Sequence, residues 1–313
     1  MISIEPRKIL EVPTSLLKSD DTLNPTKVEE AFHKNITKKE YVDKNNLYKQ
    51  SDVQQKLKAI YYNKCAYCEL EFLERDMHID HYRPKKSQNL SKCDGNYAYY
   101  WLAYSFSNLI PLCPSCNRYK SNCFDINASN RILFDAKKQD LESLHFVTQD
   151  YNKYEQPKLI HPEYDNDFEK YISYDRVGKM MVMIHANHNE ADKDMIYRLR
   201  YSIKTCGLNK RRDLVKLRLL FVNDFIELLN ASVLLFKTTS QKEDLQYFKS
   251  AIDFFKRHAK KDSEFLLLKR FLIHPKKIIL LLRDKDTKVQ RVIQKAILEY
   301  ARDLLEEYKI LQS

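Results

Sequence analysis

The alternation of apolar and polar residues predicts a long helical part and a shorter mixed part. From Glu190 onward, apolar residues recur at intervals of three and four, the spacing that one face of an α-helix presents. Two such runs are Leu214, Leu217, Phe221, Phe225 and Leu228, and later Ile293, Ala296, Tyr300, Leu304 and Tyr308. Pro275 lies between them and predicts a break, because proline removes a backbone donor and clashes with the preceding turn. The last third of the chain is therefore expected to be helical.

Upstream of residue 190 the patterns are shorter and mixed. Ser51–Tyr62 opens with a Ser-Asp cap signal and continues with helix-forming residues, which predicts a helix. Segment 171–184 has two arms rich in β-forming residues around Gly178 and predicts a hairpin. The first 50 residues are polar and lysine-rich, which indicates an irregular or partly helical lead-in. The aromatic run Asn96–Phe106 is interpreted as a packing helix, with stacking on bases as the alternative.

Together these patterns predict an α+β protein. Its expected parts are a lead-in over residues 1–50, a core over 51–135, a mixed α/β extension with the hairpin over 136–205, and a helical domain over 206–313. The core contains nearly all of the residues with unusual chemistry.

Composition restricts the classes of function. The net charge is +11, and residues 208–313 contain 23 Lys and Arg against 14 Asp and Glu. A basic surplus of this kind favours a polyanionic partner such as nucleic acid. The chain has three glycines, whereas phosphate loops and dinucleotide sites need clustered glycines for close backbone approach. Nucleotide-driven chemistry within the chain is therefore not expected.

The apolar segments and the cysteine count bear on the compartment. The start of the chain lacks the apolar stretch of a signal peptide. The longest aliphatic run, Ile278–Leu282, is far shorter than the ~20 residues that span a membrane. Seven cysteines, an odd number, argue against a fully paired disulfide framework. We therefore expect a cytoplasmic protein without a membrane partner.

Two C-x2-C pairs lie within the core, namely Cys65 with Cys68 and Cys113 with Cys116. Four thiolates surround zinc tetrahedrally, and the two-residue gap lets one turn offer both sulfurs to the same ion. A redox site is the alternative for a single pair, but the strand–helix setting of a thioredoxin-like motif is missing. The pattern predicts a structural zinc site without catalytic chemistry. The remaining cysteines are interpreted as small core residues: Cys93, Cys123 and Cys206.

An acid-histidine dipeptide and two asparagines lie between and beside these pairs. Asp80-His81 is followed by Asn108, ahead of the second cysteine pair, and by Asn117, directly after it. The order C-x2-C, D-H-x2-P, N-L-x3-C-x2-C-N-x2-K resembles the HNH endonucleases with a ββα-metal fold and a four-cysteine zinc. The resemblance implies a small nuclease core in which zinc holds a hairpin against a helix.

The resemblance also implies a role for each residue of the motif. His81, with an ordinary histidine pKa of about 6.5, would be the general base that deprotonates water. Asp80 and Asn117 would hold a catalytic magnesium or manganese ion, which screens phosphate charge. Asn108 would hold the loop that carries His81 by hydrogen bonds.

Several neighbouring residues are candidates for further roles. Arg83, Lys85 and Lys120 are candidate phosphate contacts, with plain surface charge as the alternative. His78 lies two residues before Asp80 and so on the same strand face. It is interpreted as a packing residue, with a place in the site as the alternative.

A second similarity reaches beyond the motif. The segments "CAYCE", "YYWLAY", "LIHPEYDNDFEKYISYDRVGK" and "CGLNKRRDLVKLR" resemble the PtuB-like HNH nuclease subunits of Septu anti-phage systems, a family also found with some retrons. The similarity covers roughly residues 60 to 220. It implies a role in bacterial defence and a PtuA-like ATPase partner of the SMC/OLD-like class. The expected target is nucleic acid, with DNA favoured over RNA.

Other functions stay open on the sequence. One is an RNase that acts on transfer RNA in the same defence setting. Another is a stand-alone modification-dependent restriction enzyme, which would need no ATPase. The last is a zinc module that binds nucleic acid without cleaving it, in which the Asp80-His81 pair would be incidental.

Overall fold

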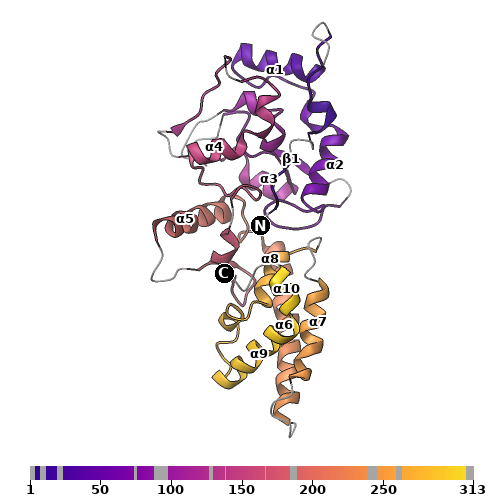
Figure 1. The fold of residues 1–313 in the computed structure, drawn as a ribbon, viewed down its shortest axis with the longest axis vertical. Helices are drawn as coiled ribbons and strands as arrows, with labels where there is room; N and C mark the ends of the chain where they lie inside the picture. The colour runs from indigo at the N-terminus through magenta and orange to yellow at the C-terminus, as the bar shows by residue number, and fades with distance from the viewer. Residues whose placement is uncertain are drawn as a thin grey trace. The chain divides into compact units, whose positions relative to one another are not determined.

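The computed structural model describes residues 4–7, 12–19, 24–73, 76–87, 98–126, 130–137, 139–165, 167–183, 189–238, 245–258 and 263–307. The chain divides into two compact units (Figure 1). Unit 1 comprises residues 1–168 and 188–207, and unit 2 comprises residues 169–187 and 208–313.

Unit 1 is built around a small ββα arrangement. Its described helices are α1 (Lys27–Lys38), α2 (Ser51–Ile60), α3 (Pro114–Lys120), α4 (Thr148–Glu155) and α5 (Glu190–Thr205). Strands β1 (His78–His81) and β2 (Leu109–Leu112) pair antiparallel, with His78 opposite Leu112 and His81 opposite Leu109. Strand β2 leads directly into α3, and this helix packs on both strands. The predicted α+β fold with a ββα core is confirmed.

The aromatic run behind the sheet is buried but does not form a helix. It contains the short 3-10 turns η4 (Tyr100–Leu102) and η5 (Phe106–Asn108). Trp101 is 2% exposed and Phe106 is fully buried, so the expected packing role is confirmed. The expected helix was wrong within the described residues, since aromatic side chains lose rotamer freedom against a preceding helical turn.

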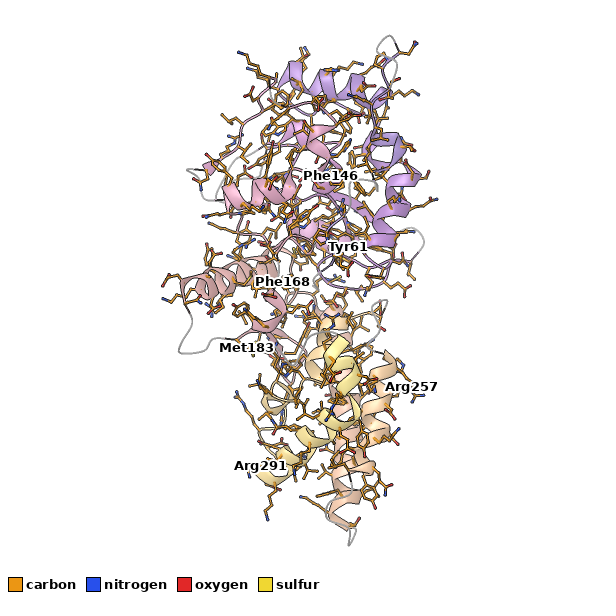
Figure 2. The ribbon with its side chains drawn as sticks, viewed as in Figure 1. Tyr61, Phe146, Phe168, Met183, Arg257 and Arg291 are labelled. Carbon is orange, nitrogen blue, oxygen red and sulfur yellow. The ribbon has the colours of Figure 1, made fainter. Side chains whose placement is uncertain are left out.

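Two fully buried ion pairs connect distant parts of unit 1. Arg7 pairs with Glu163 at 2.6 Å, and Arg83 pairs with Glu155 at 2.7 Å, with all four side chains completely covered. Tyr61, labelled in Figure 2, donates a hydrogen bond to Glu163 at 2.5 Å. Buried charges are tolerated when they are paired and hydrogen-bonded in this way, whereas loss of one partner leaves an uncompensated charge.

Unit 2 is largely helical, as the hydrophobic spacing predicts. It contains the hairpin strands β3 (Ile172–Tyr174) and β4 (Met180–Val182) and the helices α6 (Arg212–Thr238), α7 (Gln246–His258), α8 (Leu266–Leu272), α9 (Thr287–Tyr300) and α10 (Arg302–Glu307). The hairpin predicted around Gly178 is confirmed, and so is the break near Pro275, which lies between α8 and α9.

The core of unit 2 forms where α6, α7 and α9 pack together. Phe225 of α6 meets Phe255 of α7 with ring centroids 4.4 Å apart. The buried face of α6 includes Leu214 and Val222, whereas Leu217 is 39% exposed although it belongs to the predicted stripe. The apolar stripe predicted for α6 is therefore only partly buried in unit 2.

The surface of unit 2 combines positive charge with one strongly apolar helix. Arg257 of α7 and Arg291 of α9 are exposed and extend from their helices in Figure 2. Among the described residues, α6 has the length and composition of a helix that could cross a membrane. One such helix is weak evidence for a membrane, because core helices of soluble proteins share these properties.

A buried histidine in unit 1 makes its stability pH-dependent. Burial lowers the pKa of His145 from 6.5 to about 4. Below pH ~6.5 the unfolded chain binds a proton that the folded chain does not, so the free energy of unfolding falls as the pH drops towards ~4, by up to ~3 kcal/mol. Above pH ~6.5 the His145 ring is neutral in both the folded and the unfolded chain, so it no longer lowers the free energy of unfolding.

This pH dependence can be measured by urea unfolding between about pH 7 and about pH 5. The fluorescence of Trp101, the single tryptophan, reports on unit 1. His145→Gln is expected to lose less stability on acidification than the wild type. His33→Gln, at an exposed position in α1, should behave like the wild type. Equal losses in wild type and His145→Gln would contradict the expectation.

Candidate active site

Four cysteines come together beside the ββα arrangement. The sulfur atoms of Cys65, Cys68, Cys113 and Cys116 all lie within 4.8 Å of one another, and all four residues are buried. The Cys68 and Cys113 sulfurs are 3.6 Å apart. Four sulfurs bound tetrahedrally at about 2.3 Å from zinc would be ~3.8 Å apart, so the observed spacing fits such an ion.

The thiols of the cluster influence one another's ionisation. Burial raises the pKa of the Cys65 thiol well above its ordinary value. Hydrogen bonds with the neighbouring thiols raise the pKa of Cys116 and lower that of Cys113. Four ionised sulfurs cannot share this space without a cation to offset their charge. Of the other cysteines, Cys206 is buried and free, and Cys123 is disulfide-bonded, which corrects its interpretation as a plain core thiol. Cys93 lies outside the described residues.

His81 ends strand β1 and is 4% exposed. Its Nε2 lies 2.9 Å from the carbonyl oxygen of Ala103. Because a carbonyl only accepts hydrogen bonds, Nε2 carries the proton and Nδ1 is the nitrogen that can accept one. Burial, with a further contribution from the charge of Lys85, lowers the pKa of His81 well below 6.5, so the ring is neutral at physiological pH. The geometry is that of a proton acceptor.

Asp80 points to the other side of β1 and meets Lys120 of α3. Their Oδ2 and Nζ atoms are 2.7 Å apart, and Lys120 also donates to the carbonyl oxygen of His81 at 2.8 Å. The Lys120 side chain is fully buried. The expected phosphate contact of Lys120 was therefore wrong, because its ammonium group is buried and connects α3 to β1 through Asp80 and the His81 carbonyl.

Asn117 and His78 meet on the same side of the sheet as Asp80. The Nδ2 atom of Asn117 lies 3.0 Å from Nδ1 of His78, and the His78 side chain is exposed. A cavity of about 270 Å³ is lined by these two residues together with Asp80, His81 and Lys85, among others. The interpretation of His78 as a packing residue was wrong, because it faces this cavity.

Asn108 is fully buried at the end of η5, directly before β2. Its Oδ1 accepts a hydrogen bond from the Arg83 backbone N–H at 2.8 Å, and its Nδ2 donates to the Arg83 carbonyl at 3.1 Å and to the Leu102 carbonyl at 3.2 Å. Three bonds from one amide thus hold the loop that follows His81 against the aromatic turn. This placement agrees with the loop-holding role implied for Asn108.

Arg83 does not face the cavity. Its side chain is completely buried, pairs with Glu155, and donates to the Asn152 side chain at 2.8 Å. The expected phosphate contact was wrong because the guanidinium has buried acceptors contributed by α4, far along the chain. Arg83 is a structural residue of unit 1.

Lys85 does line the cavity, where it contacts Tyr48, a residue that the sequence analysis did not single out. Its Nζ lies 3.8 Å from the centroid of the Tyr48 ring, 4.2 Å from that of Tyr41, and 2.5 Å from the Tyr48 hydroxyl. Desolvation, followed by repulsion from Lys49, lowers the pKa of Lys85 to about 7. Tyr48 also contacts His81 edge-to-face, with centroids 4.5 Å apart.

Tyr48 belongs to the lead-in, in the 3-10 turn η3 (Leu47–Lys49). The carboxylate of Asp43 organises this segment: it accepts hydrogen bonds from the Leu47 N–H at 2.9 Å and from the Tyr104 hydroxyl at 3.0 Å. No local pattern distinguishes Tyr48 from the other tyrosines, since its role depends on contacts with residues much later in the chain.

Comparison with known proteins assigns this constellation. The family model for HNH endonucleases matches residues 65–122, which include both cysteine pairs, Asp80, His81, Asn108 and Asn117. The chain contains an HNH endonuclease domain. It is also homologous to the Septu protein PtuB of Bacillus mycoides (strain KBAB4), with 33% identity over 147 residues. That match covers 45% of this chain and 48% of PtuB.

A second relative comes from the same organism. The Septu protein PtuA is 31% identical over 145 residues, which are 45% of this chain and 18% of PtuA. The chain thus spans about half the length of one curated relative and less than a fifth of the other. The matched segment includes the cysteine cluster and most of the cavity residues, whereas Tyr48, Lys49 and Gln54 lie outside it.

The cysteine cluster predicts that one lost sulfur destabilises unit 1. Cys116→Ser is expected to reduce the zinc content of the purified protein below one ion per chain and to lower the free energy of unfolding by more than about 3 kcal/mol. Elemental analysis measures the zinc, and urea unfolding followed by Trp101 fluorescence measures the stability. Cys206→Ser, at a buried cysteine outside the cluster, should keep its zinc. Full zinc content in Cys116→Ser would contradict the assignment.

Proposed function

We propose that this chain is a metal-dependent HNH endonuclease that hydrolyses phosphodiester bonds in DNA. The observation that carries the proposal is the His81 imidazole: it is neutral, held through Nε2 by the Ala103 carbonyl, and lines one cavity with Asp80 and Asn117. A neutral imidazole in a fixed orientation beside potential metal ligands is what water-mediated phosphodiester hydrolysis requires.

In the proposed reaction, His81 accepts a proton from a water molecule through Nδ1. The hydrogen bond from Nε2 to Ala103 keeps the ring in the tautomer that has Nδ1 unprotonated and stabilises the positive charge that develops on the ring. Tyr48 packs against the ring edge-to-face and restricts its rotation. The fixed ring thereby removes part of the entropic cost of orienting base and water.

The donors in the cavity fit a divalent ion. Asp80 supplies a carboxylate whose Oδ2 is paired with Lys120, and Asn117 supplies an amide from the first turn of α3. Both belong to the oxygen-donor class that magnesium and manganese prefer. Such an ion, when bound, would screen the phosphate charge and stabilise the leaving oxygen. Zinc in the four-cysteine cluster would be structural, since four sulfurs leave no open position.

Lys85 is the proposed phosphate contact. Its ammonium lies at the cavity beside His81, and an anionic phosphate at this position would raise its lowered pKa by direct attraction. The hydroxyl of Tyr48 keeps the side chain in place. Arg83 and Lys120 are both buried in ion pairs. Of the three basic residues expected to contact phosphate, Lys85 is therefore the one proposed to do so.

The proposed setting is bacterial anti-phage defence in the cytoplasm. The homology to the Septu proteins PtuB and PtuA supports a place in a Septu-type system, with a PtuA-like ATPase as the partner of this chain. The basic surplus of residues 208–313 supports nucleic acid as the substrate. A pull-down of the tagged full-length chain from cells that also express a PtuA-like protein tests the partnership.

The nuclease activity is tested by replacing the base. His81→Ala is expected to slow nicking of supercoiled plasmid in magnesium or manganese by about 10²–10⁴-fold, the typical contribution of a positioned general base. His33→Ala, at an exposed histidine of unit 1, should retain wild-type activity. Undiminished nicking by His81→Ala would refute the mechanism, and cleavage of transfer RNA in preference to plasmid would replace DNA by RNA as the substrate.

Tyr48 is expected to affect turnover through two separable contacts. Tyr48→Phe removes the hydroxyl that holds Lys85 and should slow single-turnover nicking by roughly tenfold, whereas Tyr48→Ala also frees the His81 ring and should slow it by roughly 10²-fold. Trp101 fluorescence checks that each variant is folded. Tyr154→Phe, at an exposed tyrosine, is the matched control. A wild-type rate in Tyr48→Ala would rule out this positioning role.

A further inference from the structure

His78 is a cavity residue for which the HNH mechanism described above has no role. Its side chain lies on the same face of β1 as that of Asp80, because residues two apart on a strand point the same way. Its side chain is exposed and lines the cavity together with Asp80 and Asn117. An exposed imidazole beside a carboxylate and an amide offers one more donor on the side of the sheet where the ion would lie.

The contact between His78 and Asn117 has the dimensions of a shared coordination sphere. Nδ1 of His78 and the terminal amide of Asn117 are 3.0 Å apart. Two adjacent ligands in an octahedral site with bonds of about 2.1 Å are also separated by ~3.0 Å. A half-turn of the amide exchanges its nitrogen for its oxygen, so that Asn117 would offer an oxygen donor next to the ring nitrogen of His78.

We propose that His78 is a third ligand of the catalytic divalent ion, binding through Nδ1 beside Asp80 and Asn117. This inference rests on the proposed function, because it adds a ligand to the same site. The amide nitrogen of Asn117 donates a hydrogen bond to the Nδ1 lone pair of His78. A bound ion would instead be held by the amide oxygen of Asn117 and by Nδ1 of His78, after both side chains turn towards it.

The proposal has a consequence for metal choice. Carboxylate and amide oxygens accept magnesium and manganese about equally well as donor types, whereas an imidazole nitrogen favours transition ions. A site with one nitrogen donor therefore binds manganese more tightly than magnesium. Removal of the imidazole should weaken manganese binding most and bring the affinities for the two ions closer together.

The test uses the zinc-loaded full chain without nucleic acid, titrated with manganese and followed by the electron paramagnetic resonance signal of the free ion. His78→Ala should raise the manganese dissociation constant on the order of tenfold or more. Magnesium, measured by competition, should change by less than about threefold because its oxygen ligands remain. His33→Ala, at an exposed histidine outside the cavity, is the matched control.

A spectroscopic signature separates a ligand from a residue that merely supports Asn117. Pulsed resonance of bound manganese should show modulation by a directly bound nitrogen-14 nucleus in the wild type and in His81→Ala, and none in His78→Ala. No nitrogen modulation in the wild type, or an unchanged manganese affinity in His78→Ala, would overturn the proposal. Plasmid nicking that depends on His81 but occurs without this nitrogen signal refutes the ligand alone. His78-dependent manganese binding in a chain that cleaves no nucleic acid refutes the nuclease function alone.

Discussion

The site depends on one constraint, the closing of four buried sulfurs around a common point. Strands β1 and β2 have four residues each and α3 has seven. A two-stranded sheet and a two-turn helix are both marginal in water without further support. The cluster supplies that support because Cys113 and Cys116 begin α3, whereas Cys65 and Cys68 belong to the turn that precedes β1. These short elements carry Asp80, His81 and Asn117. The positions of the three side chains therefore depend on the cluster.

The titratable side chains that line the cavity differ in their immediate surroundings. Burial keeps His81 neutral, and Lys85 is partly desolvated between two tyrosine rings. Asp80 is paired with an ammonium from the interior. His81 and Asp80, neighbours in sequence, thus line the same cavity with different immediate partners, because successive side chains leave a strand on opposite faces.

Much of the fold and of the site follows from sequence, and the failures have a common physical origin. The cysteine spacing, the Asp80-His81 pair and the two asparagines are local patterns, and the HNH domain contains all of them. Arg83 and Lys120 are basic residues next to the motif, and local pattern suggests contact with phosphate. Their acceptors, Glu155 and Asp80, lie across the tertiary structure, and only the folded chain shows that both side chains are buried. Tyr48 was missed for the same reason, since the two residues that it contacts at the cavity, His81 and Lys85, lie outside the lead-in.

The internal pairing of Asp80 with Lys120 bears on how the cavity is shaped. A carboxylate that depends on an external cation for compensation tends to swing away when that cation leaves. Here the buried ammonium of Lys120 lies 2.7 Å from Oδ2 of Asp80 and also donates a hydrogen bond to the carbonyl oxygen of His81. The protein itself therefore holds the Asp80 carboxylate in place. A divalent ion bound there, as proposed, would exchange with water at the other carboxylate oxygen without a rearrangement of the pocket, which would make the site a preassembled receptor.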